Sequence, residues 1–449
     1  MIKFCVRLVQ RWLPEPFIFA ILLTFVAAVV TMPVCHQTPL EIVEHWGDGV
    51  WNLLAFAMQM ALVLVCGSAL AAAPAIKRGI DSLARIPKSP AAAIALVTVV
   101  SALACWLNWG FGLIIGVVFA KAIARQLAGV DYRLLIASAY SGFVVWHAGL
   151  SGSIPLTMAT EGEIGKVTNG MMNLTVPVSQ TIFDVHNLVM VVLVIVAITV
   201  ANTLMHPKKG AVTVDPMLLA EDAPQPPIVK GGREEKTPAQ RLEYSPVLSW
   251  AIALLLAAYV VVKLGFRGGS LDLGTVIMIF LSLGLMLHGS PMAYVRAFGK
   301  ATTGAAGIIL QFPLYAGIMG IITGVGASGE SMGNVIADFC VNNSTPVTYP
   351  LITFIFAALL NMFVPSGGGH WAIQAPIMLP AGAALGVADG LTGTAIAWGD
   401  AWTNLIQPFW ALPALAIAKL SARDIMGYCL VDLLVTGVII CGGLIVWAL

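Results

Sequence analysis

A few polar side chains interrupt stretches of this sequence that are otherwise apolar, and they are of types that bind ions. Asp400 stands inside such a stretch, where a charge costs at least ~2.5 kcal/mol on insertion scales, so we interpret it as a cation ligand or a proton site. His147 and Asn404 are candidates for the same coupling role, because an imidazole or an amide oxygen can also hold a proton or a cation. A helix cap is the alternative for Asp400, and an ordinary buried hydrogen-bonding residue is the alternative for His147.

A run of three glycines is the second feature that could do chemistry. The sequence Pro-Ser-Gly-Gly-Gly-His-Trp occupies 365–371, between the apolar runs 348–364 and 371–387. Three consecutive glycines are not expected to hold a helix, so their backbone N–H and C=O groups would be free at membrane depth. Irregular backbone survives there only when it is buried in protein or lines a polar cavity. We therefore predict a substrate site that contains Ser366, Gly367, Gly368, Gly369 and His370.

A matching interruption occurs earlier in the chain, at Asn108-Trp109-Gly110-Phe111-Gly112. Asn108 and Asn361 are 253 residues apart, as are Pro155 and Pro408, whereas Gln59 and Gln311 are 252 apart. This common offset predicts an internal duplication, in which interrupted elements from both halves meet at one centre. The further substrate-site candidates are Asn108, Gly110, Gly112, Ser151, Asn361 and Thr403. Helix capping is the alternative for the two asparagines, Ser366 and Thr403, and an ordinary buried hydrogen-bonding residue is the alternative for His370.

The expected centre would gather the two tips and two breaks in spans, at 146–153 and 399–404, and it would contain no Arg or Lys. An anionic substrate would then be held by backbone N–H groups, helix N-termini and neutral donors. A bound cation would be the other source of positive charge. Trp109, Phe111, Phe363 and Trp371 are candidates to wall a pocket for a short apolar tail, although packing or lipid contact explains each one equally well.

The composition excludes a soluble protein. Charged residues make up 10 % of the chain, against about 25 % in soluble domains, and hydrophobic residues make up 59 %. The mean hydropathy is +0.91, and the apolar runs are too long for barrel strands, so we predict an all-α polytopic membrane protein. The predicted spans are 16–35, 52–75, 133–157, 183–205, 247–266, 271–288, 300–323, 392–419 and 425–448, with two hairpins, which we expect to be re-entrant, at 91–127 and 348–387.

Basic residues orient these spans, because Lys and Arg accumulate in cytoplasmic loops. Lys3, Arg7 and Arg11 place the N-terminus in the cytoplasm. The first apolar run follows them as in a signal peptide, but it is long enough to span, lacks a convincing small-residue cleavage site and precedes many more spans. We therefore interpret it as a retained helix of the plasma (bacterial inner) membrane. Parity then puts the C-terminus on the opposite side and inverts the second half, a plan that recurs in secondary transporters. The expected domains are an N-terminal repeat (1–205), a cytoplasmic linker (206–246), a connecting helix (247–270) and a C-terminal inverted repeat (271–449).

Other classes of protein find little support. The segment 149–153 misses the G-x-S-x-G pattern at its last position, and the sequence has no HExxH motif and no phosphate loop, which disfavours a hydrolase. A channel would not need two opposed hairpin tips. Seven cysteines without paired spacing predict neither disulfides nor metal ligands, and a net charge of +1 gives no indication of a nucleic-acid partner. We expect a carrier, not an enzyme, with no cofactor other than a coupling Na⁺ or H⁺.

Several long motifs resemble those of the short-chain fatty acid transporter family, the acetoacetate and butyrate permeases. They begin with Arg-Trp-Leu-Pro-Glu-Pro-Phe-Ile-Phe-Ala at 11–20 and Trp-Gly-Asp-Gly at 46–49. They continue with 51–56, 108–112, Val-Pro-Ser-Gly-Gly-Gly-His-Trp at 364–371, Gln-Pro-Phe-Trp-Ala-Leu-Pro-Ala at 407–414 and 423–429. The resemblance extends from about 8 to 447 and is highly specific.

That family is similar to the ion-transporter superfamily of elevator carriers. The resemblance therefore implies paired inverted repeats, each with a hairpin and a broken helix, and a homodimer in the lipid bilayer. The implied activity is symport of short-chain monocarboxylates such as butyrate and acetoacetate with Na⁺ or H⁺. A carrier of another small organic anion, such as a dicarboxylate, is the alternative, and the absence of Arg and Lys at the centre favours one substrate carboxylate over two.

Overall fold

A computed structural model describes residues 16–207, 210–213, 237–269, 271–362, 364, 366–407 and 410–449. These parts of the chain contain helices and no strand, which confirms the predicted all-α class. Some residues used in the sequence analysis lie outside the described residues, namely Lys3, Arg7, Arg11, Phe363, Pro365, Pro408 and most of the predicted linker 206–246.

The helices of the first half include short ones between the long ones. They are α2 (Pro16–Val34), α3 (Pro39–Gly49), α4 (Leu54–Ala71), α5 (Pro74–Leu83), α6 (Pro90–Leu107), α7 (Trp109–Gln126), α8 (Tyr132–Ser141), the 3-10 helix η1 (Gly142–Ala148), α9 (Ser153–Met158), α10 (Glu163–Val167), η2 (Val178–Gln180) and α11 (Val185–Leu204). Thr38 and Ser89 cap α3 and α6, and a proline with its fixed φ follows each of them at the first helical position.

The second half repeats this mixture of lengths. Its helices are α13 (Pro238–Glu243), α14 (Pro246–Val261), the π-helix η3 (Val262–Phe266), α15 (Leu273–His288), α16 (Pro291–Thr302), η4 (Thr303–Ala305), α17 (Ala306–Thr323), α18 (Met332–Asn342), α19 (Tyr349–Asn361), α20 (Gly367–Ala384), α21 (Asp389–Thr403), α22 (Ala411–Ala418) and α23 (Ala422–Ala448). Eight helical segments among the described residues are long and apolar enough to cross a membrane, and three shorter apolar helices accompany them.

The two halves follow one order of elements at the offset seen in the sequence. When the bounds of α3 and α4 are moved by 253 positions, they fall within one residue of those of α16 and α17. The same shift overlays α6 and α7 on most of α19 and α20. This is the order that the predicted duplication requires, and the inverted orientation of the two copies stays a prediction.

The predicted break in 133–157 is present. The helix begun by α8 tightens into η1 and ends at Ala148, and α9 begins at Ser153 after a turn. Gly149 in this turn packs so closely on the backbone of Trp106 that a Cβ would not fit. The chain is therefore interrupted at 149–152, beside the first hairpin.

The predicted break in 392–419 lies later than expected. Gly399 through Thr403 belong to α21, so placing the break at 399–404 was wrong, and the helical structure resumes only at α22. Gly399 does not interrupt the helix because its bare Cα allows close packing on the carbonyl of Phe354 in α19. The side-chain amides of Asn361 and Asn404 bond to the carbonyl of Asp400 near the helix end.

The three consecutive glycines are helical, contrary to the sequence-based expectation. Gly367, Gly368 and Gly369 form the first turn of α20, capped by Ser366, whose hydroxyl accepts the N–H of Gly369 (3.4 Å). The cap by Ser366 and the close packing of Phe56, Phe312 and Tyr315 on the glycines support this turn. The expected free N–H groups are thus those of Gly367 and Gly368 in the first turn of α20.

At both predicted hairpins the structure has two consecutive helices that contact each other. Only Asn108 separates α6 from α7, whereas residues 362–366 separate α19 from α20. The helix α19 has 13 residues, or about 20 Å, too few to cross a bilayer core of about 30 Å, whereas α6, α7 and α20 have 18 each. The re-entrant form of the hairpins stays a prediction.

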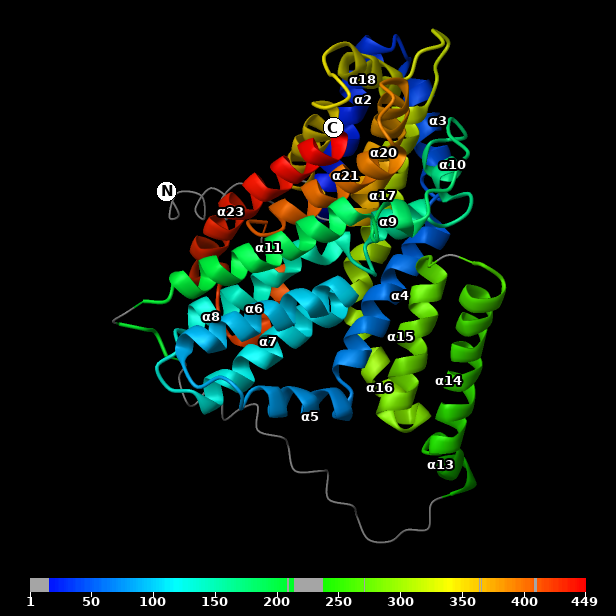
Figure 1. The fold of residues 1–449 in the computed structure, drawn as a ribbon. Coiled ribbons are helices and arrows are strands. Elements are labelled where there is room, and N and C mark those ends of the chain that lie inside the picture. The colour runs from blue at the N-terminus through cyan, green and yellow to red at the C-terminus, as the bar shows by residue number, and fades with distance from the viewer. Residues whose placement is uncertain are drawn as a thin grey trace.

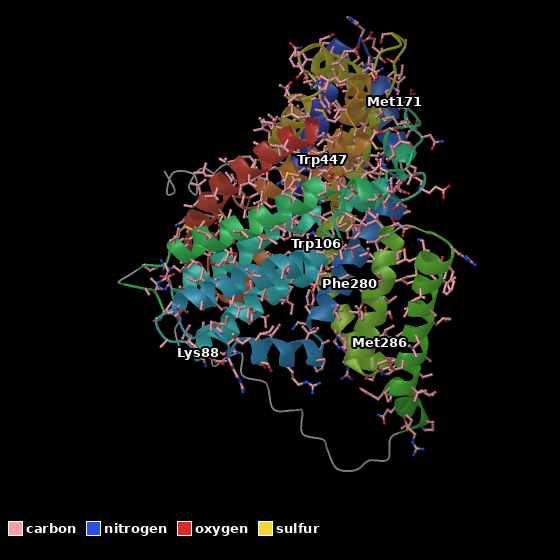
Figure 2. The ribbon with its side chains drawn as sticks, viewed as in Figure 1. Lys88, Trp106, Met171, Phe280, Met286 and Trp447 are labelled. Atoms are coloured by element: carbon pink, nitrogen blue, oxygen red, sulfur yellow. The ribbon has the colours of Figure 1, made fainter. Side chains whose placement is uncertain are left out.

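The helices gather into two groups (Figure 1). In one, α4 packs against α15 and α16, and α14 lies outside α15. The other contains α6, α7, α8, α11, α21 and α23, and Trp447 of α23 stacks on His186 of α11 with ring centres 5.4 Å apart (Figure 2). The hairpin helix α7 contacts α4, and the hairpin helix α20 contacts α17, which itself packs on α4. The hairpin helices with predicted site residues therefore lie beside α4 and its neighbour α17.

Candidate functional site

The N-terminus of α20 is one wall of the site. The N–H groups of Gly367 and Gly368 lie in the first helical turn, where backbone donors have no acceptor within the helix and the macrodipole is positive. Aromatic rings press on this turn from two helices: a Cβ at Gly368 would lie 2.8 Å from Phe312 of α17 and 2.8 Å from Phe56 of α4. Only glycine therefore lets the turn approach these rings.

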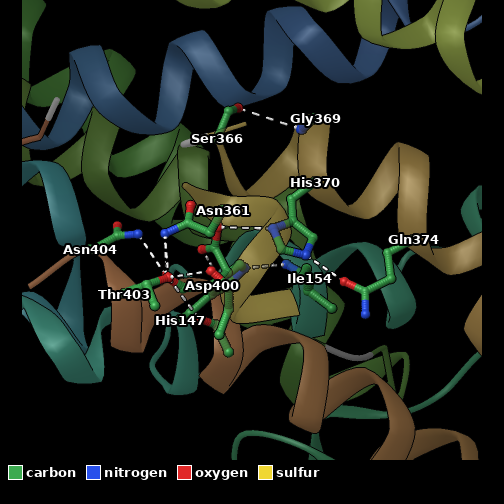
Figure 3. A network of polar contacts seen from close by, with 12 residues as sticks. His147, Ile154, Asn361, Ser366, Gly369, His370, Gln374, Asp400, Thr403 and Asn404 are labelled. Atoms are coloured by element: carbon green, nitrogen blue, oxygen red, sulfur yellow. Dashed lines mark hydrogen bonds and ion pairs between the residues drawn. The ribbon is translucent and has the colours of Figure 1, made fainter. Parts of the chain in front are cut away.

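His147 and Asp400 form the centre of a buried polar network (Figure 3). His147 Nδ1 lies 2.8 Å from Asp400 Oδ2, and both side chains are almost completely excluded from solvent. They come from η1 and α21, which pack against each other. A Cβ at Gly367 would lie 2.6 Å from His147 Cε1, so the network adjoins the N-terminus of α20 directly.

The bonds of His147 fix the position of its proton. Its Nε2 accepts the backbone N–H of Ile154 (3.1 Å) and lies 3.0 Å from Ser153 Oγ. A nitrogen that accepts a hydrogen bond carries no proton, so the proton lies on Nδ1 and is donated to Asp400. His147 is therefore neutral in this state and does not balance the carboxylate charge.

His370 faces the other carboxylate oxygen. Its Nε2 contacts Gln374 Oε1, and the amide nitrogen of Gln374 donates to the carbonyl of Thr353 (3.1 Å), so His370 Nε2 is the donor. His370 Nδ1 then lies 3.4 Å from Asp400 Oδ1, and neither atom makes a hydrogen bond with a described residue. A neutral ring would present its lone pair to the carboxylate, and a shared proton would convert this repulsion into a hydrogen bond.

Three further candidates join the same network. Asn361 donates its amide N–H groups to the carbonyl of Asp400 (2.8 Å) and to Thr403 Oγ1 (2.9 Å). Asn404 also donates to the carbonyl of Asp400 (2.6 Å). The Oδ1 atoms of both asparagines are buried without a described partner, so they could accept a hydrogen bond from a substrate or bind a cation.

A small cavity lies beside this network. Its volume is about 20 Å³, which holds about one water molecule. Its polar lining comes from Ser153, Ser366, Gly367 and Gly368, and its apolar lining is mainly aromatic: Met60, Trp109, Phe143, Trp146, Ile308, Phe312 and Trp410. The cavity thus combines free helix N–H groups at one wall with aromatic rings at the others.

Four sequence-predicted residues lie outside the network. Asn108 caps α7 by accepting the N–H of Phe111 (2.8 Å), and Ser151 accepts the N–H of Trp109 (2.9 Å). Gly110 packs on Leu64 of α4, and Gly112 packs on the backbone of α6. These residues shape the first hairpin tip and hold Trp109 against the cavity, and direct contact with a substrate stays a prediction for them.

Several residues of the site were not predicted from the sequence. Of the described members of the predicted aromatic wall, which are Trp109, Phe111 and Trp371, Trp109 lines the cavity. The other rings come from η1, α17 and the segment before α22. Gln374 could have been found by its spacing, because it follows His370 by one helical turn. A second buried carboxylate, Asp432 in α23, lies outside this site and was not singled out, although it stands inside the predicted span 425–448.

The described residues include no group of three or more His, Cys, Asp or Glu side chains that could hold a metal ion. The six cysteines recorded in this part of the chain are free.

Comparisons with known proteins identify the family of this chain. The family model described as "Short chain fatty acid transporter" matches residues 1–447. A proposed short-chain fatty acid transporter of Escherichia coli (strain K12) is 44 % identical over 443 residues, which cover 98 % of both chains. A protein of the same description from Haemophilus influenzae (strain ATCC 51907) is 42 % identical over 448 residues, again covering 98 % of both chains.

Two solved transporters share the fold at low sequence identity. The YdaH transporter of Alcanivorax borkumensis has a TM-score of 0.62 and 17 % identity, covering 97 % of this chain and 98 % of its own. Neisseria gonorrhoeae MtrF, described with a class of antimetabolite efflux pumps, has a TM-score of 0.59 and 15 % identity, covering 98 % and 97 %. With the family model matching almost every residue and two relatives above 40 % identity, this chain belongs to the short-chain fatty acid transporter family.

Proposed function

We propose that this protein is a secondary active transporter of short-chain monocarboxylates such as butyrate and acetoacetate. The observation that carries the proposal is the cavity in which free N–H groups of α20 face a wall of aromatic rings. A short carboxylate has the complementary shape, with an anionic head for the helix N-terminus and a small apolar tail for the rings. At about 20 Å³ the cavity is nearly closed, so it must widen to admit a substrate.

The site is suited to one carboxylate. Neutral donors and the positive end of the α20 dipole would hold it, and the residues that line the cavity include no Lys or Arg to bind a second. The apolar wall would meet the other end of the molecule, where a second carboxylate would lose its hydration without gaining a partner. A dicarboxylate is therefore the poorer substrate.

Transport is coupled to a proton that Asp400 and His370 share. A bare Asp400 carboxylate and a substrate anion would repel each other in a dry site. The unpaired atoms His370 Nδ1 and Asp400 Oδ1, 3.4 Å apart, are placed to bind one proton between them. Proton binding would remove the repulsion between the Asp400 carboxylate and the substrate anion, so the substrate would bind more tightly when the proton is present. Proton and anion would then cross together as a symport.

The movement is proposed to be of the elevator type, in a homodimer with inverted repeats. The group of α6, α7, α8, α11, α21 and α23 would carry the site past the group around α4 and α15. The location is the bacterial inner membrane, with the N-terminus cytoplasmic. α5 and the basic loop with Lys88 lie at one end of the molecule, and α10 and α18 lie at the other (Figures 1 and 2). Because basic loops face the cytoplasm, the end with α5 would be the cytoplasmic one, which supports this orientation.

Intrinsic fluorescence of the purified protein tests the binding proposal, because Trp109, Trp146 and Trp410 line the cavity. Titration with butyrate should change the emission saturably, and acetoacetate should compete. Succinate at the same concentration should cause no saturable change. A saturable response to succinate without one to butyrate would overturn the assignment.

A further inference from the structure

A second buried carboxylate lies in the membrane-spanning part of the chain, outside the network of His147 and Asp400. Asp432 stands in the interior of α23, and its side chain is 0 % exposed. Neither of its carboxylate oxygens makes a hydrogen bond with a described residue. A bare carboxylate is costly in such surroundings, so a positive charge must accompany it.

Asp432 lies beside a group of polar side chains from three other helices, which are linked to one another by hydrogen bonds. They are Thr98 of α6, Ser141 of α8 and Asn202 of α11, and each is 0 % exposed. Ser141 and Asn202 lie close enough to Asp432 to interact with it. The amide nitrogen of Asn202 links the group, donating to Ser141 Oγ (2.9 Å) and Thr98 Oγ1 (3.5 Å).

Each side-chain donor of this group makes a hydrogen bond to an acceptor other than Asp432. The Ser141 hydroxyl donates to the carbonyl of Ser138 (3.1 Å), and the Thr98 hydroxyl donates to that of Ile94 (2.9 Å). Both amide protons of Asn202 go to these two hydroxyl oxygens. What remains is a set of acceptors without donors: both oxygens of Asp432, Oδ1 of Asn202 and the remaining lone pairs of the hydroxyls.

No positively charged side chain in the described chain balances Asp432. The ionisable group that acts on it is the buried thiol of Cys429, one turn earlier on α23. Arg133 of α8 pairs with Asp424 (3.2 Å), near the beginning of α23. The phenol of Tyr140, also on α8, donates to the carbonyl of Asn404 (2.7 Å). None of these groups supplies the missing charge.

We propose that Asp432, Asn202, Ser141 and Thr98 form a sodium site. Na⁺ takes oxygen ligands, and carboxylate, amide and hydroxyl oxygens are what this group offers. One carboxylate matches one monovalent charge, whereas a divalent ion would leave an excess positive charge buried. A proton on Asp432 would satisfy only one of the free acceptors, whereas Na⁺ contacts several at once.

Sodium bound here would connect α6, α8, α11 and α23, the four helices that carry its proposed ligands. Ser141 immediately precedes η1, the segment that carries His147, so the ion would anchor the start of that segment. Binding to the folded protein alone stabilises it in proportion to the occupancy of the site. Sodium should therefore raise the thermal stability of the protein without any substrate present.

The test measures sodium binding to the purified full-length protein, with choline replacing sodium to hold the ionic strength constant. Radioactive sodium should bind saturably to the wild type, and Tm should rise with sodium concentration. Asp432→Asn should abolish both responses. Thr98→Val, which keeps the carboxylate and the shape of the side chain, should weaken sodium binding by about tenfold or more, the loss of about 1.4 kcal/mol.

Two control variants separate this site from other effects. Thr199→Val removes a hydroxyl of α11 that makes the same bond to a carbonyl four residues earlier, Ile195 (2.7 Å), but lies outside the cluster, and it should bind sodium as the wild type does. Asp400→Asn should also keep sodium binding, whether or not the proposed proton coupling is correct. If Asp432→Asn does not fold, Thr98→Val decides.

Three results would overturn the sodium site. The first is a wild type that binds no sodium. The second is normal sodium affinity in Thr98→Val or Asp432→Asn. The third is loss of sodium binding in Asp400→Asn with retention in Asp432→Asn, which would assign the ion to the substrate network.

Discussion

His147 Nδ1 donates a hydrogen bond to Asp400 Oδ2 over 2.8 Å, although the two residues are 253 positions apart in the chain. The same spacing separates Asn108 from Asn361, which begin the two hairpin tips. His147 and Asp400 therefore occupy corresponding positions of the two predicted repeats. If an axis relates the two repeats, residues at corresponding positions can touch only close to that axis. In a transporter with two repeats, the substrate is expected to pass near the same axis.

Asp400→Asn should separate accumulation from exchange. The amide resembles the protonated carboxyl in shape and charge, so the substrate could still bind and cross, but no proton could be released. In proteoliposomes we expect at least a tenfold loss of butyrate accumulation driven by a proton gradient, with exchange of internal for external butyrate retained. Both modes are measured in one vesicle preparation.

The matched control is Asp424→Asn, which changes a carboxylate near the start of α23 that pairs with Arg133 (3.2 Å). It should retain both modes of transport. If Asp400→Asn concentrates butyrate as well as the wild type does, Asp400 is a structural residue and coupling lies elsewhere.

Gly368→Val should abolish uptake. The Cβ of the new side chain would lie only 2.8 Å from Phe312 and 2.8 Å from Phe56, so the collision would push the first turn of α20 away from the cavity. We expect uptake of labelled butyrate to fall at least a hundredfold, while insertion into the membrane is largely retained.

Gly299→Val provides the comparison, because Gly299 lies in α16 with no neighbouring atom within 4 Å of its Cβ direction. It should transport normally. Normal uptake by Gly368→Val would mean that the close approach of the rings to this turn is not needed for transport.

The sequence was sufficient for the class of fold and for most of the network. The motifs around His147, Asn361, His370 and Asp400 indicated a meeting point, because polar residues in apolar runs need partners. The helical state of Gly367–Gly369 was missed, since the propensity of glycine says nothing about a first turn supported by Ser366 and neighbouring rings.

The aromatic wall could not be predicted for a different reason. Phe312 and Trp146 lie in elements distant in sequence from the glycine turn, and only the packing of α17 and η1 on α20 shows that they face it. Asp432 was overlooked because α23 was treated as an ordinary apolar span, although its partners Ser141 and Asn202 lie in two other helices.

Ile308→Ala should shift the preferred chain length. Ile308 lines the apolar wall of the cavity, so truncating its side chain leaves room for a longer substrate tail. Each buried CH₂ contributes about 0.8 kcal/mol, so the preference for hexanoate over butyrate should rise roughly fourfold if one of its two extra CH₂ groups is buried and roughly fifteenfold if both are. The ratio of kcat/KM for the two acids measures it.

The neighbouring Ile309→Ala supplies the control for this change. Ile309 is 54 % exposed and does not line the cavity, so the preference should remain that of the wild type. An unchanged preference in Ile308→Ala would place the substrate tail elsewhere.

Competition for uptake tests the central claim most directly. Purified protein is reconstituted into liposomes with an inward proton gradient, and the uptake of labelled butyrate is measured against unlabelled acids. Acetoacetate and propionate should compete at concentrations near that of butyrate, whereas succinate and citrate should not compete, and collapse of the proton gradient should end accumulation. Strong competition by succinate or citrate, with no saturable uptake of butyrate, would contradict the account.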